Sequence, residues 1–173
     1  MTHGRDAHPV THRSFISYID RTRAYYAAQG YERPYAWAHH TRVPFTRLGK
    51  PLTSCTVGVV TTASPADTPA HPPGVLRGDK RVWCGASEPL PQRLFTDHLA
   101  WDKQTTHMDD IGSFLPLAAL QRLVTGKRLA ALSPRFYGVP TDYSQRRTRE
   151  EDTPALARMC REDGVDVALL VPI

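Results

Sequence analysis

Two short runs of β-branched and other apolar residues constrain the fold of this chain most strongly. Residues 56–62 read TVGVVTT, and residues 165–171 read VDVALLV. A strand with one face in water would alternate apolar and polar residues, whereas these runs place apolar residues on both faces. We therefore expect both runs to be core strands of a parallel sheet.

The residues between the two runs predict further helices and strands. Apolar residues at helical spacing from Phe114 to Val124, followed by Gly126, predict a helix, and Leu129–Leu132 predicts a third strand. Thr148 is a plausible N-cap of a second helix that runs to about Glu162. The order strand, helix, strand, helix, strand favours an α/β fold with a mainly parallel sheet, of the open three-layer Rossmann or flavodoxin type.

Burial of both strand faces has a testable consequence. We expect Val57 and Val59 in the first run, and Val167 and Leu169 in the last, to be buried. A polar substitution at any of these positions would then cost several kcal/mol.

The N-terminal third differs from the rest of the chain. Residues 13–29 have the spacing of an amphipathic helix that Gly30 ends, and residues 34–52 carry aromatic residues and three prolines, as an ordered surface arm would. We expect one structural domain, with the helix and arm in residues 1–53 and the α/β part in residues 54–173. The proline-rich residues 64–80 predict a mobile loop.

Composition argues against several classes of protein. Lys and Arg outnumber Asp and Glu by 22 to 17 but are spread along the chain, which makes nucleic-acid binding a weak interpretation. No apolar stretch approaches the length of a membrane span, and the N-terminus lacks the apolar core of a signal peptide, so we expect a cytoplasmic protein without a membrane partner. Three well-separated cysteines predict reduced, buried and inert thiols, with Cys55 at the amino end of its strand.

The densest polar cluster of the sequence lies between the first and third strands. Its imidazoles and carboxylates could bind substrate, transfer protons or, less favourably, hold a divalent metal. A polar loop whose Asp residues cap the helix near Phe114 explains the same residues. The members are His98, Asp102, His107, Asp109 and Asp110.

A second group of polar residues directly follows the predicted strand Leu129–Leu132, where a parallel sheet places its ligand loops. Arg135 could take a substrate carboxylate through two parallel hydrogen bonds, or it could form an ion pair with a neighbouring Asp. Tyr137 and Tyr143 belong to the same candidate loop.

Three stretches of the chain resemble the selenoprotein B subunits of the glycine, sarcosine, betaine and D-proline reductases, and most closely the short single-domain relatives of that family. They are residues 31–40 (YERPYAWAHH) with 43–48 (VPFTRL), residues 97–110 (DHLAWDKQTTHMDD), and residues 134–144 (PRFYGVPTDYS). A fourth stretch, residues 162–173 (EDGVDVALLVPI), is similar to the family segment that leads into its redox motif.

The resemblance implies an oxidoreductase subunit that acts on a small nitrogenous or carboxylate substrate through a selenol or thiol and a disulfide. The nucleophile is expected directly after Ile173, with a cysteine three places further on and then a histidine, so that the codon after Ile173 is expected to be a UGA read as selenocysteine. Implied partners are a reductase subunit or a thioredoxin-like reductant, and neither a cofactor nor a bound metal is expected. The implied substrate-binding residues are His98, Asp102, His107, Asp109, Arg135, Tyr137 and Tyr143.

Two other classes of protein compete with the reductase. The first is a non-catalytic ligand-binding or scaffold protein that keeps the family pocket without the redox pair. The second is a metal hydrolase built on His98, His107, Asp109 and Asp110. Thiol-dependent turnover, ligand binding without turnover, and metal analysis of the purified protein would separate the three.

Overall fold

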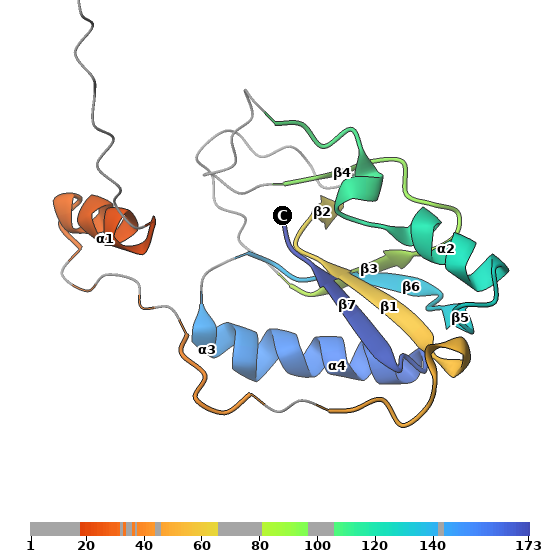
Figure 1. Cartoon of the computed structure of the whole chain (residues 1–173). Coiled ribbons are helices and arrows are strands. Elements are labelled where there is room, and N and C mark those ends of the chain that lie inside the picture. The colour runs from red at the N-terminus through yellow and green to blue at the C-terminus, as the bar shows by residue number, and fades with distance from the viewer. Residues whose placement is uncertain are drawn as a thin grey trace, which may run out of the picture. The chain divides into compact units, whose positions relative to one another are not determined.

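The computed structural model describes residues 18–31, 33, 36, 38–43, 46–65, 81–96, 106–141 and 144–173 (Figure 1). The chain divides into two compact units, residues 1–43 and residues 44–173. The first unit contains helix α1, Tyr18–Ala28, and Gly30 follows it with φ 83°, as the predicted glycine stop requires. Residues 13–17 of the predicted helix lie outside the described residues.

The second unit is built on a mainly parallel sheet, which confirms the predicted α/β class. Strand β1 pairs in parallel with β5, β6 and β7, and β3 pairs with β6 in antiparallel orientation. Backbone bonds of β1 reach β5 and β6 on one side and the start of β7 on the other, so β1 lies inside the sheet. The strands are β1, Thr56–Thr61; β3, Trp83–Ala86; β5, Ala131–Leu132; β6, Arg135–Gly138; and β7, Val167–Val171.

The third predicted parallel strand is displaced along the sequence. Of Leu129–Leu132 only the last two residues form β5, and β6 follows after a break at Ser133 and Pro134. The prediction that Arg135–Gly138 belongs to a ligand loop is therefore wrong. These residues continue the sheet because Phe136 and Tyr137, both fully buried, point to its opposite faces.

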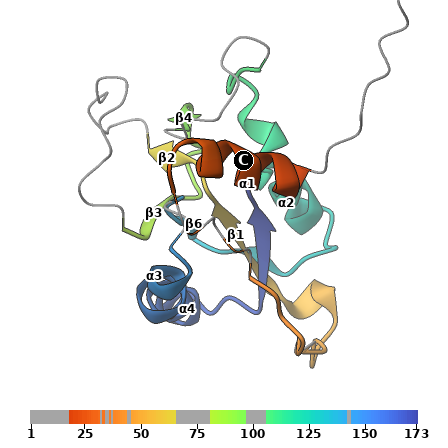
Figure 2. The same cartoon turned by 90° about the vertical axis from the view of Figure 1, so that its left-hand side faces the viewer.

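Helices cover the two faces of the sheet (Figures 1 and 2). Helix α2, Leu117–Thr125, follows the 3-10 turn η2, Ile111–Ser113, and lies on the face that holds the main hydrophobic core. The opposite face carries α3, Gln145–Arg147, the π-turn η3, Thr148–Asp152, and α4, Thr153–Glu162, which run as one continuous helix. The core residues are Val59, Ala63, Leu94, Phe114, Leu115, Leu117 and Phe136.

The last helix begins earlier than its sequence predicts. Ser144, and not Thr148, is the N-cap, because the Ser144 hydroxyl accepts a hydrogen bond of 3.2 Å from the backbone N–H of Arg147. Thr148 lies inside the helix. The predicted end at Asp163 and Gly164 is confirmed, with Gly164 at φ 65°.

The two apolar strands differ in how deeply they are buried. Val57 and Val59 of β1 are buried, as predicted, but Leu169 of β7 is 40% exposed and Val167 is only partly buried. The prediction of burial on both faces is wrong for β7 because, among the described strands, it has a neighbour on one side only. β7 is an edge strand.

Two short segments complete the described part of the second unit. A two-stranded antiparallel ladder joins β2, Ser64–Pro65, to β4, Leu94–Phe95, and the 3-10 turn η1, Leu52–Ser54, precedes β1. Residues 66–80 of the predicted mobile loop lie outside the described residues. Among the helices described, none has the length and apolar character needed to cross a membrane.

Candidate functional site

Four of the seven predicted site residues lie in the described part of the chain. They form two groups, one around Arg135 and Tyr137 and one around His107 and Asp109. His98, Asp102 and Tyr143 lie outside the described residues.

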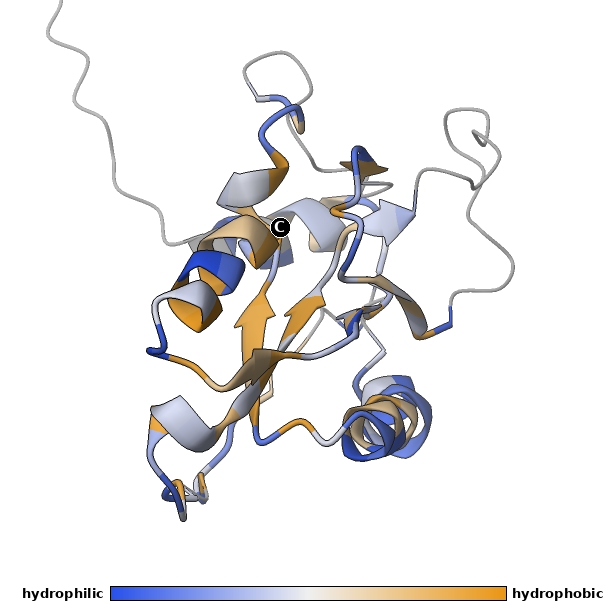
Figure 3. Ribbon diagram, turned by 90° about the vertical axis from the view of Figure 1, so that its right-hand side faces the viewer, coloured by the Kyte–Doolittle hydropathy of each residue, from blue (hydrophilic) through white to orange (hydrophobic). Residues whose placement is uncertain are grey.

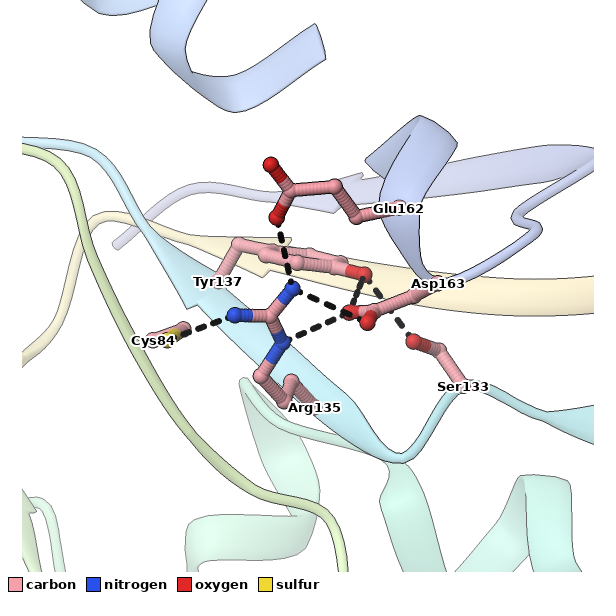
Figure 4. A network of polar contacts seen from close by, with 6 residues as sticks. All are labelled: Cys84, Ser133, Arg135, Tyr137, Glu162 and Asp163. Atoms are coloured by element: carbon pink, nitrogen blue, oxygen red, sulfur yellow. Dashed lines mark hydrogen bonds and ion pairs between the residues drawn. The ribbon is translucent and has the colours of Figure 1, made fainter. Parts of the chain in front are cut away.

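The Arg135 side chain is held by carboxylates of its own chain (Figure 4). Its Nε lies 2.8 Å from Oδ2 of Asp163 and its Nη2 lies 2.9 Å from Oδ1 of the same carboxylate, which is a bidentate ion pair. Nη2 also lies 3.3 Å from Oε2 of Glu162. Arg135 thus makes with Asp163 the two parallel hydrogen bonds that the sequence also allows with a substrate carboxylate, and the Asp163 side chain is only 10% exposed.

Tyr137 reaches the same carboxylate from the interior of the sheet. Its hydroxyl donates a hydrogen bond of 2.6 Å to Oδ2 of Asp163 and lies 2.9 Å from the hydroxyl of Ser133. Burial, and then the hydrogen bond to Asp163, raise the pKa of Tyr137, so it remains a neutral donor. The Arg135 guanidinium, and then the Tyr137 hydroxyl, lower the pKa of Asp163, which remains a carboxylate.

These contacts join three elements of the fold. Asp163 belongs to the turn that leads from α4 to β7, while Arg135 and Tyr137 belong to β6 and Ser133 to the break before it. The network therefore fixes the end of α4 on the sheet at the amino end of β6. Sequence reasoning missed Asp163 and Ser133, because the only visible signal was the Asp-Gly pair at a helix end.

Two cysteines lie beside this network. Nη1 of Arg135 lies 3.7 Å from the Sγ of Cys84, which stands opposite Tyr137 across β3 and β6. Burial raises the pKa of Cys160, which favours its thiol form.

The third cysteine belongs to the amino end of β1. Cys55 is buried directly before β1, and its Sγ donates to the carbonyl of Pro51 at 3.3 Å. The predicted place of Cys55 at the amino end is confirmed.

His107 and Asp109 interact with each other in an exposed segment. The backbone N–H of Asp109 donates to Nδ1 of His107 at 3.3 Å, and the side chains are 71% and 92% exposed for His107 and Asp109. Asp110 occupies the N-cap position of η2, but neither η2 nor α2 has a side-chain cap hydrogen bond. The alternative in which the Asp110 carboxylate caps this helix is therefore wrong.

The structure does not bring His107 and Arg135 together. Residues 107–110 lie before α2, and α2 runs back from the carboxyl edge of the sheet to the amino end of β5. His107 therefore lies toward the carboxyl edge, whereas Arg135 is the first residue of β6. A shared pocket built on these two residues is therefore absent from the described structure. Within that same part of the chain, no group of three His, Cys, Asp or Glu side chains could hold a metal ion.

The carboxyl edge of β1 and β7 carries a polar contact that the sequence did not predict. The Thr62 hydroxyl accepts a hydrogen bond of 2.9 Å from the backbone N–H of Ile173 and lies 3.1 Å from the backbone carbonyl of Ile173, to which it donates. The contact fixes the backbone that follows β7 beside the end of β1. The sequence pattern predicts Thr62 only as the last residue of a strand.

The opposite end of β7 is tied to β1 by a carboxylate. Oδ2 of Asp166 accepts a hydrogen bond of 2.8 Å from the backbone N–H of Thr56 and lies 2.8 Å from Nζ of Lys50. The hydrogen bond to Asp166 raises the pKa of Lys50, and Lys50 followed by the Thr56 N–H lowers the pKa of Asp166. Both ends of β7 are thus fastened to β1.

Comparison of the chain with protein-family models, with curated proteins and with solved structures gave no match.

Proposed function

We propose that this chain is a reductase-like oxidoreductase subunit whose reacting selenol or thiol directly follows Ile173. Its substrate class is a small nitrogenous or carboxylate compound. The proposal rests on the resemblance of four stretches of the sequence to the B subunits of the glycine and D-proline reductases, of which residues 162–173 are the most informative.

The observation that carries the proposal is the contact between Thr62 and Ile173. In open α/β sheets, ligands bind outside the carboxyl ends of the parallel strands. β1 and β7 are parallel over five register positions, and the Thr62 hydroxyl holds both backbone polar groups of Ile173 at that edge. A nucleophile attached to Ile173 would start from a fixed backbone position on the ligand side of the sheet.

The electron balance of the proposed step is that of thiol chemistry. The selenolate or thiolate attacks the substrate carbon that bears the leaving group, so that a Se–C or S–C bond forms and the leaving group departs with the electron pair of its own bond. A nearby thiolate then attacks the selenium or sulfur and forms a selenenylsulfide or disulfide, while the product leaves with the electron pair of the broken Se–C or S–C bond and takes up a proton. The two thiol-type groups are thus oxidised by two electrons, and the substrate carbon is reduced by the same two. A thioredoxin-like dithiol then restores the reduced pair.

The reading frame beyond codon 173 tests the proposal first. The proposal predicts that the codon after Ile173 is UGA, that a cysteine codon follows three places further on, and that a histidine codon comes next. A chain expressed with that continuation should oxidise a dithiol in the presence of its substrate, and the variant with serine at the first added position should not. A UAA or UAG codon, or a frame without the cysteine, would overturn it.

The Arg135 network favours a second candidate, a non-catalytic binding or scaffold protein. The guanidinium that was expected to hold a substrate carboxylate is occupied by Asp163 and Glu162 of the same chain. This function predicts binding of small amino or carboxylic acids without turnover and without a part for Arg135, measured by calorimetry on the chain as given. Thiol-dependent turnover would exclude it.

A further inference from the structure

The outer edge of β7 has no role in the proposed function. Leu169 and Leu170 are 40% and 67% exposed, and β1 is the only strand in the described residues that pairs with β7. An exposed apolar edge strand presents a row of unpaired N–H and C=O groups to any other strand. β7 also lacks the devices that usually block such pairing, since Val167–Val171 contains no charged residue, proline or glycine.

The backbone direction of β7 follows from its register with β1. The carbonyl of Val57 accepts a hydrogen bond of 2.8 Å from the N–H of Ser133, so the backbone polar groups of Val57 point away from β7. In a parallel pair, one of two direct partners points to the other strand when the second points away, so Val167, the partner of Val57, points toward β1. Because successive residues of a strand alternate in this respect, the N–H and C=O groups at the outer edge are those of Ala168 and Leu170.

Charge limits where two copies of this chain can meet. The formal net charge of +5 opposes self-association in general. The β7 edge is free of charge, and Asp166, which directly precedes the strand, is paired with Lys50 at 2.8 Å. Two copies can therefore approach through this edge without placing like charges next to each other.

We propose that β7 pairs in antiparallel orientation with β7 of a second copy of this chain, about a two-fold axis at Leu169. In this register Leu169 stands opposite its own counterpart, and Val167 stands opposite Val171. These are non-hydrogen-bonded pairs, in which the facing side chains lie close together. The register also sets the small side chain of Ala168 opposite the large one of Leu170, on the other face. Because Ala168 and Leu170 point outward, each of their two pairs can exchange two backbone hydrogen bonds.

The pairing joins the sheets of two copies into one continuous sheet. It covers Leu169 and Leu170, the two exposed leucines of the strand. Since each copy contributes only five residues of β7, the interface is small, and the dimer forms in a weak, concentration-dependent manner.

Sedimentation velocity from about 1 µM to about 1 mM tests the proposal with two variants. The unchanged chain should shift from monomer to dimer across this range. Leu169→Lys sets two ammonium groups opposite each other and should keep the chain monomeric. Leu170→Lys is the matched control, because its charge faces Ala168 of the second copy, and it should weaken association by about tenfold or less.

A chain that stays monomeric at the highest concentration overturns the proposal, as does Leu169→Lys that associates like the unchanged chain. Nuclear Overhauser contacts give a readout that needs no variant. Val167 and Val171 lie about 13 Å apart on one strand, so a contact between them arises only between copies. Its absence in a sample that sediments as a dimer also overturns the register.

Discussion

Strands β1 and β7 have similar apolar sequences and lie side by side over five register positions, yet only β1 is buried. Figure 3 shows apolar residues along both strands. Among the described strands, β1 has neighbours on both sides, whereas β7 pairs with β1 alone and leaves Leu170 67% exposed. An apolar run therefore identifies a strand of the sheet, but its place in the strand order decides how much of it is buried.

Introducing a carboxylate into each of the two strands should give the largest difference. Val59→Asp places a charge in the core, at a side chain that is 0% exposed, and should cost more than about 4 kcal/mol of unfolding free energy. Leu170→Asp keeps its charge in water and should cost less than about 1 kcal/mol. Urea unfolding of both variants measures the difference, and similar losses would contradict the assignment of β7 to the edge.

A larger side chain should also cost more stability in β1 than in β7. Gly58 and Ala168 are direct partners, but a Cβ at Gly58 would lie 3.1 Å from both the Tyr137 ring and Val165. Gly58→Val should therefore cost about 1–3 kcal/mol, while Ala168→Val at the exposed edge should change stability by about 0.5 kcal/mol or less. Thermal unfolding of the two variants decides this, and a tolerated Gly58→Val would show that β1 is not closely covered.

The contacts of Asp163 should contribute measurably to the unfolding free energy, because they fasten the turn before β7 to β6. Asp163→Asn removes the ion pair with Arg135 and weakens the acceptor of the buried Tyr137 hydroxyl, with an expected cost of about 1–3 kcal/mol at pH 7. Glu162→Gln is the control, since this side chain is exposed and its contact is longer, and it should have little effect.

The same variant makes a prediction about pH. The folded state lowers the pKa of Asp163 below its unfolded value of about 3.9, so its contribution is present above that pH and is lost as pH falls through the folded value. The stability difference between the unchanged chain and Asp163→Asn should be constant from about pH 5 to 7 and shrink below about pH 4. A difference that grows toward low pH would contradict this sign.

The ion pair at the amino end of β7 should have the smallest effect. Lys50→Met removes the Nζ contact with Asp166 but leaves the bond from Asp166 to the Thr56 N–H, and Lys50 is well exposed. We expect the melting temperature to fall by less than about 2 °C, and by less still at high salt. A larger, salt-independent loss would show that Lys50 fastens β7 to the sheet.

Much of the fold could be predicted because hydrophobic pattern and glycine position carry it. The parallel strands around residues 56–62 and 165–171 and the glycine-ended helices follow from such local signals. The edge position of β7 could not be predicted, because strand order depends on contacts between distant segments. The start of the last helix at Ser144 was missed since several Ser and Thr residues precede it and only geometry selects the cap.

The candidate site was less predictable for the same physical reason. Arg135 and Tyr137 were selected as polar residues after a strand, but the burial of Phe136 and Tyr137 extends the sheet through them. Their partner Asp163 lies 28 residues from Arg135 in sequence, and nothing in the local pattern connects the two. His98, Asp102 and Tyr143 remain predictions.

Amide hydrogen exchange in dilute solution, where the chain is monomeric, tests the contrast between β1 and β7 most directly. The account predicts slow exchange for Val57 and Gly58 of β1, which point to opposite sides of their strand. In β7 it predicts slow exchange for Leu169 and Val171 and fast exchange for Ala168 and Leu170. Equal protection of these β7 amides would mean that its outer edge is covered within one chain, and would contradict the account.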